Sequence, residues 1–584
     1  MLRRFGARLV IPAALLAIAC TAAAPLWLTP TWPRSHEELR YLVLTDLFAR
    51  ALGDGVAYPR FLPDLYGGYG YPTFCFYQPG FFWIAALFAA LPLPLHEALK
   101  LALVAMLAGG AWGAFRLGGA LANRRYGLFA AALFLLTPYL FVDLYVRGDL
   151  SEALGLLLGP WVLFFAVDLA RRLARGASPA AAMLGLALAV GALVLAHPAP
   201  ALALLPATAA ILAALAWRAP HGRALLARAV ACFAAGIALA APYWGGLLAL
   251  RGSVGFDRLV GGFYAPEAHG VAPWQLVSHA WGFGGSSAGA HDDGMSLQLG
   301  AVHLVLGLAG AWAGRRSRAI AVAAAAWALL VLLVLDAASP FWRHAGVLRF
   351  LQFPWRLLAA TATFQVAAAM GLSAWTAALP ARAEAALLGG LALVALGWHA
   401  DQFAISGATG PPDAILRDYH ARVKRTTFEH FAYRDEFTPK TAQRRPDAPR
   451  DLDAPPVRLE GEGRVTALPG ASPQRVRVRI EAPAATAARI EQLYLPGWEV
   501  RLDGAPIARD ALERSLSPEG FARVAVPAGE HRLEARYRGP PGAGARALGM
   551  LAALLPFALL LRPPRAVGSA SPRAAPAGPG HSTT

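Results

Sequence analysis

Three neighbouring polar residues, His36, Glu37 and Glu38, follow the first apolar stretch of the chain. A carboxylate at this place could act as a general base on an acceptor hydroxyl, because such a base must lie within hydrogen-bond reach of the proton. A charge cluster at a membrane boundary would have the same composition and no chemical role. The Gly-, Tyr- and Pro-rich stretch that follows adds three polar candidates, Asp64, Tyr69 and Tyr71.

A second polar cluster contains Arg147, Asp149 and Glu152. Because Asp149 and Glu152 stand at positions i and i+3, a helix would place both carboxylates on one face. They could bind a metal ion or carry a proton, while Arg147 balances their charge or holds a phosphate. An Asp just before an apolar helix is also an ordinary helix cap, so position alone leaves both interpretations open.

Two further sites stand at the ends of apolar stretches. His197, before Pro198, could be a metal ligand or a phosphate donor, or it could only solvate a tight turn. The segment RFLQFPWR contains Arg349, Gln352 and Arg356. An arginine at membrane depth is costly unless it is paired or faces a cavity, and a lipid-linked phosphate is a natural partner. The alternative is snorkelling to lipid headgroups.

Composition identifies the elements that must position these residues. The chain has 584 residues, of which 57% are hydrophobic and 15% are charged, and its mean hydropathy is +0.45. Many apolar runs are about 17–25 residues long, as a membrane-crossing helix requires. The net charge of +17 does not indicate nucleic acid as a partner, because the arginines form short clusters between apolar runs, as in cytoplasmic loops.

We expect a mainly α-helical polytopic membrane protein of about twelve spans, with both ends in the cytoplasm. The predicted spans are 9–30, 97–121, 126–145, 153–170, 180–196, 199–217, 227–249, 298–314, 319–336, 357–378, 384–400 and 546–562. The apolar segment 79–94 is left out, because counting it would move the later arginine clusters to the outer face. We therefore expect it to be an interfacial or re-entrant helix within the first outer loop, 31–96.

The part of the chain after residue 400 differs from the rest. Residues 401–456 are charged and Pro-rich, which predicts an extended connector. Residues 457–540 alternate apolar and polar side chains with turn signals between, which predicts an extracytoplasmic β-sandwich. The last span follows, and the Pro-, Ala- and Ser-rich tail 563–584 is expected to be a disordered cytoplasmic segment.

Several of these segments together resemble a known group of bacterial membrane proteins. They are PRFLPDLYGGYGYPTFCFYQP at 59–79, YVRGDLSEALGLLLGPW at 145–161, LVLAHPAP at 193–200, LQFPWRLL at 351–358 and YLPGWEVRLDG at 494–504. The group is labelled 6-pyruvoyl-tetrahydropterin synthase-related, and it is similar in plan to the GT-C superfamily of membrane glycosyltransferases. The chain itself offers no support for the pterin chemistry of that label, since it has no evident zinc-histidine set.

The GT-C resemblance implies transfer of a sugar, with inversion, from a polyprenyl-phosphate carrier to a glycan, lipid or protein acceptor outside the cytoplasmic membrane. The first outer loop of such enzymes opens with an acidic residue, often after His, which His36-Glu37 matches. The acidic residue of their second outer loop is matched by Asp149 or Glu152. A divalent cation, Mg²⁺ or Mn²⁺, is an option, held by Glu37 and Asp149 if it is present.

On this reading Glu37 is the catalytic base, although Glu38 and Asp64 remain alternatives. Arg356, with Arg349, would hold the carrier phosphate, whose departure needs charge stabilisation. Two other function classes use the same outer cavity. A transporter or flippase of lipid-linked sugars would bind without bond chemistry, and a scaffold for envelope assembly would only bind. The chain has no clear internal repeat of the kind common in transporters.

Overall fold

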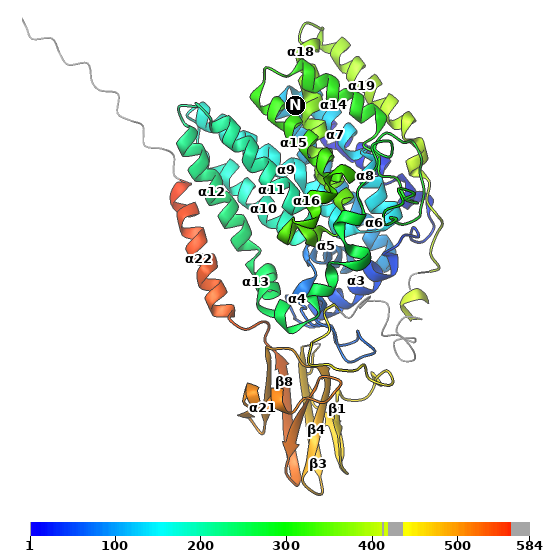
Figure 1. The fold of residues 1–584 in the computed structure, drawn as a ribbon, viewed down its shortest axis with the longest axis vertical. Helices are drawn as coiled ribbons and strands as arrows, with labels where there is room; N and C mark the ends of the chain where they lie inside the picture. The colour runs from blue at the N-terminus through cyan, green and yellow to red at the C-terminus, as the bar shows by residue number, and fades with distance from the viewer. Residues whose placement is uncertain (1, 412–413, 418–435, 473, 562–584) are drawn as a thin grey trace, which may run out of the picture.

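The computed structural model describes residues 2–411, 414–417, 436–472 and 474–561. Figure 1 shows a long helical body with a β-rich region attached at one end. The helices α3, α4 and α13 lie at that same end, whereas α18 and α19 lie at the opposite one. The first loop and the β-rich region therefore share one face of the protein.

Six helices of the described chain are long and apolar enough to cross a membrane. They are α6 (Leu95–Leu121), α9 (Leu150–Ala174), α11 (Pro198–Ala216), α12 (Gly222–Leu239), the run Pro354–Thr376 and α19 (Ala381–Trp398). Pro354–Thr376 consists of η8 (Pro354–Leu357), α17 (Leu358–Ala369), η9 (Met370–Leu372) and α18 (Ser373–Thr376). Each matches a predicted span, which makes this a multi-pass helical membrane protein.

Other predicted spans correspond to shorter apolar helices. These are α1 (Leu2–Ala22), α10 (Ala180–Ala196), α14 (Ala301–Ala313), α15 (Arg318–Val334) and α22 (Ala543–Leu560). The apolar portions have 10–17 residues, fewer than the roughly 20 that a bilayer core needs. The total of twelve spans therefore stays a prediction. The first predicted span, 9–30, is interrupted after α1 and continues as α2 (Ala24–Leu28).

Two predicted spans are broken by proline. The span 126–145 consists of α7 (Arg124–Leu135), then α8 (Pro138–Phe141) and the π-helix η1 (Val142–Arg147), with a 47° bend. Proline lacks the N–H that a continuous helix needs and clashes with the preceding turn. The predicted 227–249 divides in the same way into α12 and α13 (Ala241–Leu250), with a proline in the first turn of α13.

The first outer loop forms a helical layer. It contains α3 (Glu38–Gly53), α4 (Thr73–Phe76) and α5 (Gly80–Ala89). With ten residues, α5 spans about 15 Å, half of a bilayer core. Its Phe81 and Phe82 pack against Tyr41 of α3, with ring centroids 5.2 and 5.5 Å away. The placement of 79–94 as an interfacial element stays a prediction that this short helix fits.

Between α13 and η8, short elements precede α14 and follow α15. They are η2 (Arg251–Ser253), η3 (Phe256–Leu259), η4 (Gly262–Tyr264), η5 (Pro266–Ala268), η6 (Asp336–Ala338), α16 (Ser339–Arg343) and η7 (Gly346–Leu351). After α19, η10 (Ala400–Phe403) begins the connector. Within residues 436–456, the described part of the connector just before the strands, there is no helix or strand.

The C-terminal region has two antiparallel sheets, ordered β1-β4-β7 and β2-β3-β8-β5-β6. The strands are β1 (Val457–Leu459), β2 (Arg464–Ala467), β3 (Arg475–Ala482), β4 (Thr486–Leu493), β5 (Trp498–Leu502), β6 (Ala505–Pro506), β7 (Phe521–Val526) and β8 (Gly529–Tyr537), with α21 (Arg509–Arg514) between β6 and β7. Along β3, Val476, Val478 and Ile480 are buried and the arginines between them are more exposed. This alternation is the two-residue period read from the sequence.

The Gly- and Tyr-rich stretch of the first loop attaches the β-rich region to the helical body. The amide of Leu493 donates to the carbonyl of Tyr69 at 2.8 Å, and the Tyr69 ring stacks on Phe521 with centroids 4.9 Å apart. The Tyr71 hydroxyl accepts from the amide of Phe437 at 3.1 Å. The stretch therefore acts as a joint between the two regions.

Candidate functional site

A cavity of about 620 Å³ opens in the helical body. Its polar end is lined by His36, Glu37, Arg40, Tyr77, Gln78, Arg147, Asp149, His197, Gln352 and Arg356. Apolar side chains also line the cavity, and three of them, Leu248, Phe263 and Val347, are 50%, 46% and 68% exposed. One space thus contains charged groups together with exposed apolar side chains, which we call its apolar rim.

Backbone hydrogen bonds bring the first loop to this cavity. The amides of His36 and Glu37 donate to the carbonyls of Val146 and Arg147 at 3.0 and 2.9 Å. The next residue, Gly148, has a φ of +67°, and a Cβ there would collide with the Ser35 side chain. A glycine is required at this position both for its backbone angle and for the close approach. The two acidic segments predicted from the sequence are therefore held side by side.

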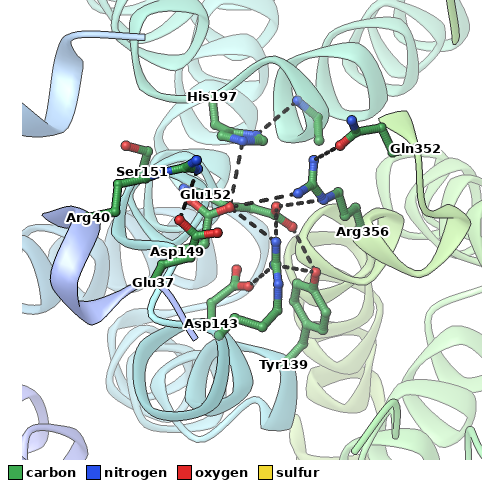
Figure 2. A network of polar contacts seen from close by, with 12 residues as sticks. Glu37, Arg40, Tyr139, Asp143, Asp149, Ser151, Glu152, His197, Gln352 and Arg356 are labelled. Carbon is green, nitrogen blue, oxygen red and sulfur yellow. Dashed lines mark hydrogen bonds and ion pairs between the residues drawn. The ribbon is translucent and has the colours of Figure 1, made fainter. Parts of the chain in front are cut away.

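Arg147 is the centre of a buried ionic cluster, and its partners Tyr139, Asp143, Asp149 and Glu152 are labelled in Figure 2. Its guanidinium donates to the Tyr139 hydroxyl at 3.0 Å, to Asp149 at 3.1 Å and to Glu152 at 3.0 Å, and it also pairs with Asp143. All these charged side chains are buried. Burying so many charges is tolerable only because each is paired and hydrogen-bonded. Three carboxylates here surround one guanidinium.

Asp149 both caps a helix and faces the cavity. Its Oδ1 accepts from the Glu152 amide at 3.1 Å, the cap of α9, and from the Tyr41 hydroxyl at 2.8 Å. The structure therefore shows the helix cap, while a chemical role for Asp149, which lines the cavity, stays a prediction. Burial alone would raise the pKa of Asp149, but His197, Arg147 and Arg356 outweigh it and hold that pKa well below its usual range. Asp149 is thus a stable anion and a poor proton acceptor.

Arg356 is bound more loosely than Arg147. Its Nε lies 3.4 Å from Glu152 and its Nη2 lies 4.0 Å from Asp149, while Nη1 donates to Gln352 at 3.5 Å. Gln352 has a φ of +64°, a strained angle for a residue with a side chain. Because Arg356 lines the cavity with long contacts, its guanidinium is the one best placed to accept an anionic ligand.

Glu37 is the most accessible carboxylate of the polar end. Its Oε2 pairs with Arg40 at 3.0 Å, and its side chain is 27% exposed, against 9% for Asp149. Arg40 also lies over the Tyr77 ring, 5.8 Å from its centroid. His36 contacts the Phe283 carbonyl through Nε2 at 3.0 Å. The side chain of Glu37 therefore faces the cavity with oxygen available for a new hydrogen bond.

The two alternative carboxylates lie elsewhere. The Glu38 side chain accepts from the Ser35 amide, and burial raises its pKa; it does not line the cavity. Asp64 lines a separate pocket of about 390 Å³ beside the β-rich region. Position thus favours Glu37 over both.

Four of the predicted binding residues do not line the cavity, namely Asp64, already placed in the separate pocket, and Arg349, Tyr69 and Tyr71. Arg349 donates to Glu267 at 3.0 Å, away from the polar end. Tyr69 and Tyr71 belong to the joint, through their bonds to Leu493 and Phe437. Glu152 lies just behind the cavity wall, in contact with Arg147 and Arg356.

Five residues of the site were not predicted from the sequence. They are Arg40, Tyr41, Tyr77, Tyr139 and Asp143. Asp143 stands four residues before Arg147, a spacing that places two charges on one helix face, so it could have been found. The tyrosines could not, because an aromatic residue in an apolar helix gives no signal for its hydroxyl partner.

Asp149, Glu152 and His197 each offer one ligand atom within 4.8 Å of the others, as a metal site would. The donors, however, are already engaged. Both oxygens of Glu152 accept hydrogen bonds, from Tyr139 at 2.7 Å and from Arg147. His197 Nδ1 accepts from the Ala199 amide at 3.2 Å, so the proton of the neutral ring sits on Nε2, the atom that faces Asp149 at 3.9 Å. A metal ligand needs that nitrogen unprotonated.

The positions of Arg147 and Arg356 also count against a metal ion at this group. Arg147 and Arg356 occupy the positions around these carboxylates that a divalent cation would take, and a cation would meet two positive charges there. The group Asp149, Glu152 and His197 therefore does not fit a divalent cation, whereas an Mg²⁺ or Mn²⁺ ion held by Glu37 and Asp149 stays a prediction.

No family model and no curated protein matches the chain. Among solved structures, it is similar to the mycobacterial arabinofuranosyltransferase AftD, with 20% identity, a TM-score of 0.39, and coverage of 66% of this chain and 26% of AftD. A variant of AftD in a second conformational class gives 19% identity, a TM-score of 0.41, and coverage of 66% and 27%. The chain thus spans about a quarter of AftD, and these TM-scores are too low to establish a shared fold.

Proposed function

We propose that the protein is a GT-C-type membrane glycosyltransferase. It would transfer a sugar, with inversion, from a polyprenyl-phosphate carrier to an acceptor hydroxyl at the extracytoplasmic face of the bacterial cytoplasmic membrane. The observation that carries the proposal is the cavity, in which an accessible carboxylate, a loosely held arginine and an exposed apolar rim share one space. A carrier lipid requires the rim, and its phosphate requires the arginine.

In the proposed reaction, Glu37 and Arg356 have separate roles. Glu37 takes the proton of the acceptor hydroxyl while the acceptor oxygen forms a bond to the anomeric carbon. The bond between that carbon and the carrier phosphate breaks on the opposite side, and its electron pair leaves with the phosphate. Arg356 stabilises the charge that develops there. Arg349 has no part in this step, because it is tied to Glu267.

In this proposal Asp149 and Glu152 act by position. They hold Arg147 and orient Arg356 toward the cavity, and no step passes through a metal ion. His197 contacts Asp149 at the wall beside them. Binding without chemistry would need only the rim and the arginine, so the accessible Glu37 is what favours an enzyme over a transporter.

Purified protein in nanodiscs, supplied with a radiolabelled polyprenyl-phosphate sugar and envelope glycan, tests the proposal. We expect covalent transfer of label, with loss of the rate in Glu37→Gln and Arg356→Gln and normal rates in the matched variants Glu38→Gln and Arg349→Gln. Movement of intact donor across a bilayer without covalent transfer would contradict the proposal and indicate a transporter.

A further inference from the structure

Two side chains of the cavity wall are buried polar groups that lack a partner. Within the part of the chain that the structure describes, neither the amide Nε2 of Gln78 nor the hydroxyl Oγ1 of Thr73 has a hydrogen-bond partner. Both residues are buried, Gln78 with only 3% of its surface exposed, and both line the cavity. Nearly all buried polar groups in native proteins are hydrogen-bonded. A hydrogen bond left unmade here costs free energy that a ligand in the cavity could recover.

The short segment that carries both residues is held in place on each side. Its first turn is closed by the amide of Tyr77, which donates to the carbonyl of Thr73 at 2.7 Å. After Gln78, a Cβ at Gly80 would lie 2.6 Å from the carbonyl oxygen of Leu195, so the chain passes close to the end of α10. The two polar groups therefore belong to a fixed wall of the cavity.

This wall borders the space in which the proposed transfer takes place. At one end the ring of Tyr77 lies against Arg40, the ion-pair partner of the proposed base. At the other end the wall meets the end of α10, which His197 follows. His197 lies 3.9 Å from Asp149, and Arg356 approaches the same carboxylate to 4.0 Å. The wall thus extends from the proposed base toward the proposed phosphate site, and the sugar must lie between these two.

The chemistry of Gln78 and Thr73 suits the hydroxyl groups of a sugar. An amide and a hydroxyl can each donate and accept a hydrogen bond, as a sugar hydroxyl does. Neither side chain carries the positive charge that favours a phosphate. The last torsion of a glutamine is broad, so the amide can turn either its nitrogen or its oxygen toward the cavity. The two residues therefore fit an uncharged ligand with several hydroxyls.

We propose that Gln78, together with Thr73, binds the hydroxyl groups of the transferred sugar and determines which sugar the protein accepts. This rests on the proposed function, which places the sugar between Glu37 and Arg356. A site with buried polar groups that need a substrate hydroxyl rejects ligands without it, because those groups then stay unpaired. Gln78 and Thr73 are unpaired in the free protein, so a sugar that does not reach them gains nothing from this wall.

The test is equilibrium binding of carrier lipids to full-length protein in neutral detergent. The probes are undecaprenyl phosphate and its mannosyl, glucosyl, galactosyl and arabinosyl esters. The measured quantity is the sugar preference, the affinity for an ester divided by the affinity for undecaprenyl phosphate. We expect at least one ester to bind more tightly than undecaprenyl phosphate, and Gln78→Met to reduce that preference by roughly five- to tenfold, as the loss of one neutral hydrogen bond would. The affinity for undecaprenyl phosphate itself should not change, because Arg356 is intact.

Two further variants complete the test. Thr73→Val should reduce the same preference, and it decides the question where Gln78→Met does not fold. Gln365→Met is the matched control, because Gln365 is buried in α17, its Nε2 has no partner in the described chain, and it is not among the residues that line the cavity. Neither methionine should lower the melting temperature, since an apolar group of similar shape replaces an amide nitrogen that makes no hydrogen bond.

The proposal is overturned if no ester binds better than undecaprenyl phosphate, if Gln78→Met keeps the full sugar preference, or if Gln365→Met loses as much of it. Protein that does not bind undecaprenyl phosphate at all would contradict the proposed function as well. Normal binding of the carrier, with a sugar preference that does not depend on Gln78, would contradict this inference alone.

Discussion

Two carboxylates of the polar end, Asp149 and Glu37, lie on adjoining backbone segments and differ in their surroundings. Asp149 is buried, bound by Tyr41, the α9 amide and Arg147, and held ionised. Glu37 has Arg40 as its one ion-pair partner among the described residues and faces the cavity. Asp149, whose oxygens already accept hydrogen bonds, stabilises the structure of the site, whereas the accessible Glu37 can accept a proton from a substrate.

The largest expected effect comes from the centre of the buried cluster. Arg147→Ala would leave Asp143 buried without its ion-pair partner and leave Asp149 and Glu152 with Arg356 as their remaining guanidinium, at 4.0 and 3.4 Å. This should cost about 3–5 kcal/mol of folding free energy. Arg40→Ala, which removes the partner of the accessible Glu37, should cost less than about 1 kcal/mol. Thermal unfolding of both variants in detergent measures the difference. Equal losses of folding free energy in the two variants would mean that the buried cluster around Arg147 contributes no more to stability than the accessible pair of Glu37 and Arg40.

A smaller effect is expected where the two segments meet. Gly148→Ala places a Cβ against Ser35 and also strains the backbone. Gly176 has a similar φ of +64° and open space around its Cβ position, so Gly176→Ala measures the backbone cost alone, about 1–2 kcal/mol. We expect Gly148→Ala to be clearly less stable than Gly176→Ala and slower in transfer, because it displaces Glu37. Equal behaviour of the two would argue against the close approach.

The pH dependence of stability should come in part from His197. Burial lowers the pKa of His197 below its ordinary value of 6.5 in the folded protein. Between that lowered value and 6.5 the unfolded chain binds a proton that the folded chain does not, so stability is full above 6.5 and falls as the pH falls, by at most about 1.4 kcal/mol per pH unit. His197→Gln should flatten the melting temperature between pH 7.5 and 5. An unchanged slope would show that other groups govern it.

The smallest effect is expected from removing divalent cations. The arginines take the positions that a cation would need. EDTA treatment followed by added Mg²⁺ or Mn²⁺ should therefore change the transfer rate by less than about twofold. A catalytic metal ion stabilises the transition state by several kcal/mol, so its removal would slow the transfer far more than that. Full loss of activity with EDTA and recovery with one ion would mean that Arg147 or Arg356 moves aside to admit it.

The sequence predicted the elements better than their interruptions. The lengths of the apolar runs predicted the first residues of α6 and α9 to within three residues. A long apolar run in lipid must form a helix, because its backbone groups have no other hydrogen-bond partners there. The bend at Pro138 was missed, although proline marks it, because the hydropathy there stays high. The break between α12, which ends at Leu239, and α13, which begins at Ala241 with Pro242 in its first turn, was missed for the same reason.

The site was predicted in part for similar reasons. Charged residues near membrane ends must find partners, which identified Arg147, Asp149 and Arg356. Spacing could not show that Arg349, seven residues before Arg356, turns to Glu267, since 3₁₀ turns separate them. Tyr69 and Tyr71 were assigned to substrate binding, whereas the structure places them at the joint. Their partners lie far along the chain, in strands β4 and β7 for Tyr69 and at Phe437 of the connector for Tyr71.

The most direct test of the account compares Glu37→Gln and Glu38→Gln in the transfer assay, with thermal unfolding to confirm that both fold. The two residues are neighbours with the same side chain, and only the Glu37 carboxylate lines the cavity. The account predicts a loss of about 100-fold or more for Glu37→Gln and a normal rate for Glu38→Gln. A folded Glu37→Gln protein that transfers sugar at the full rate would contradict it.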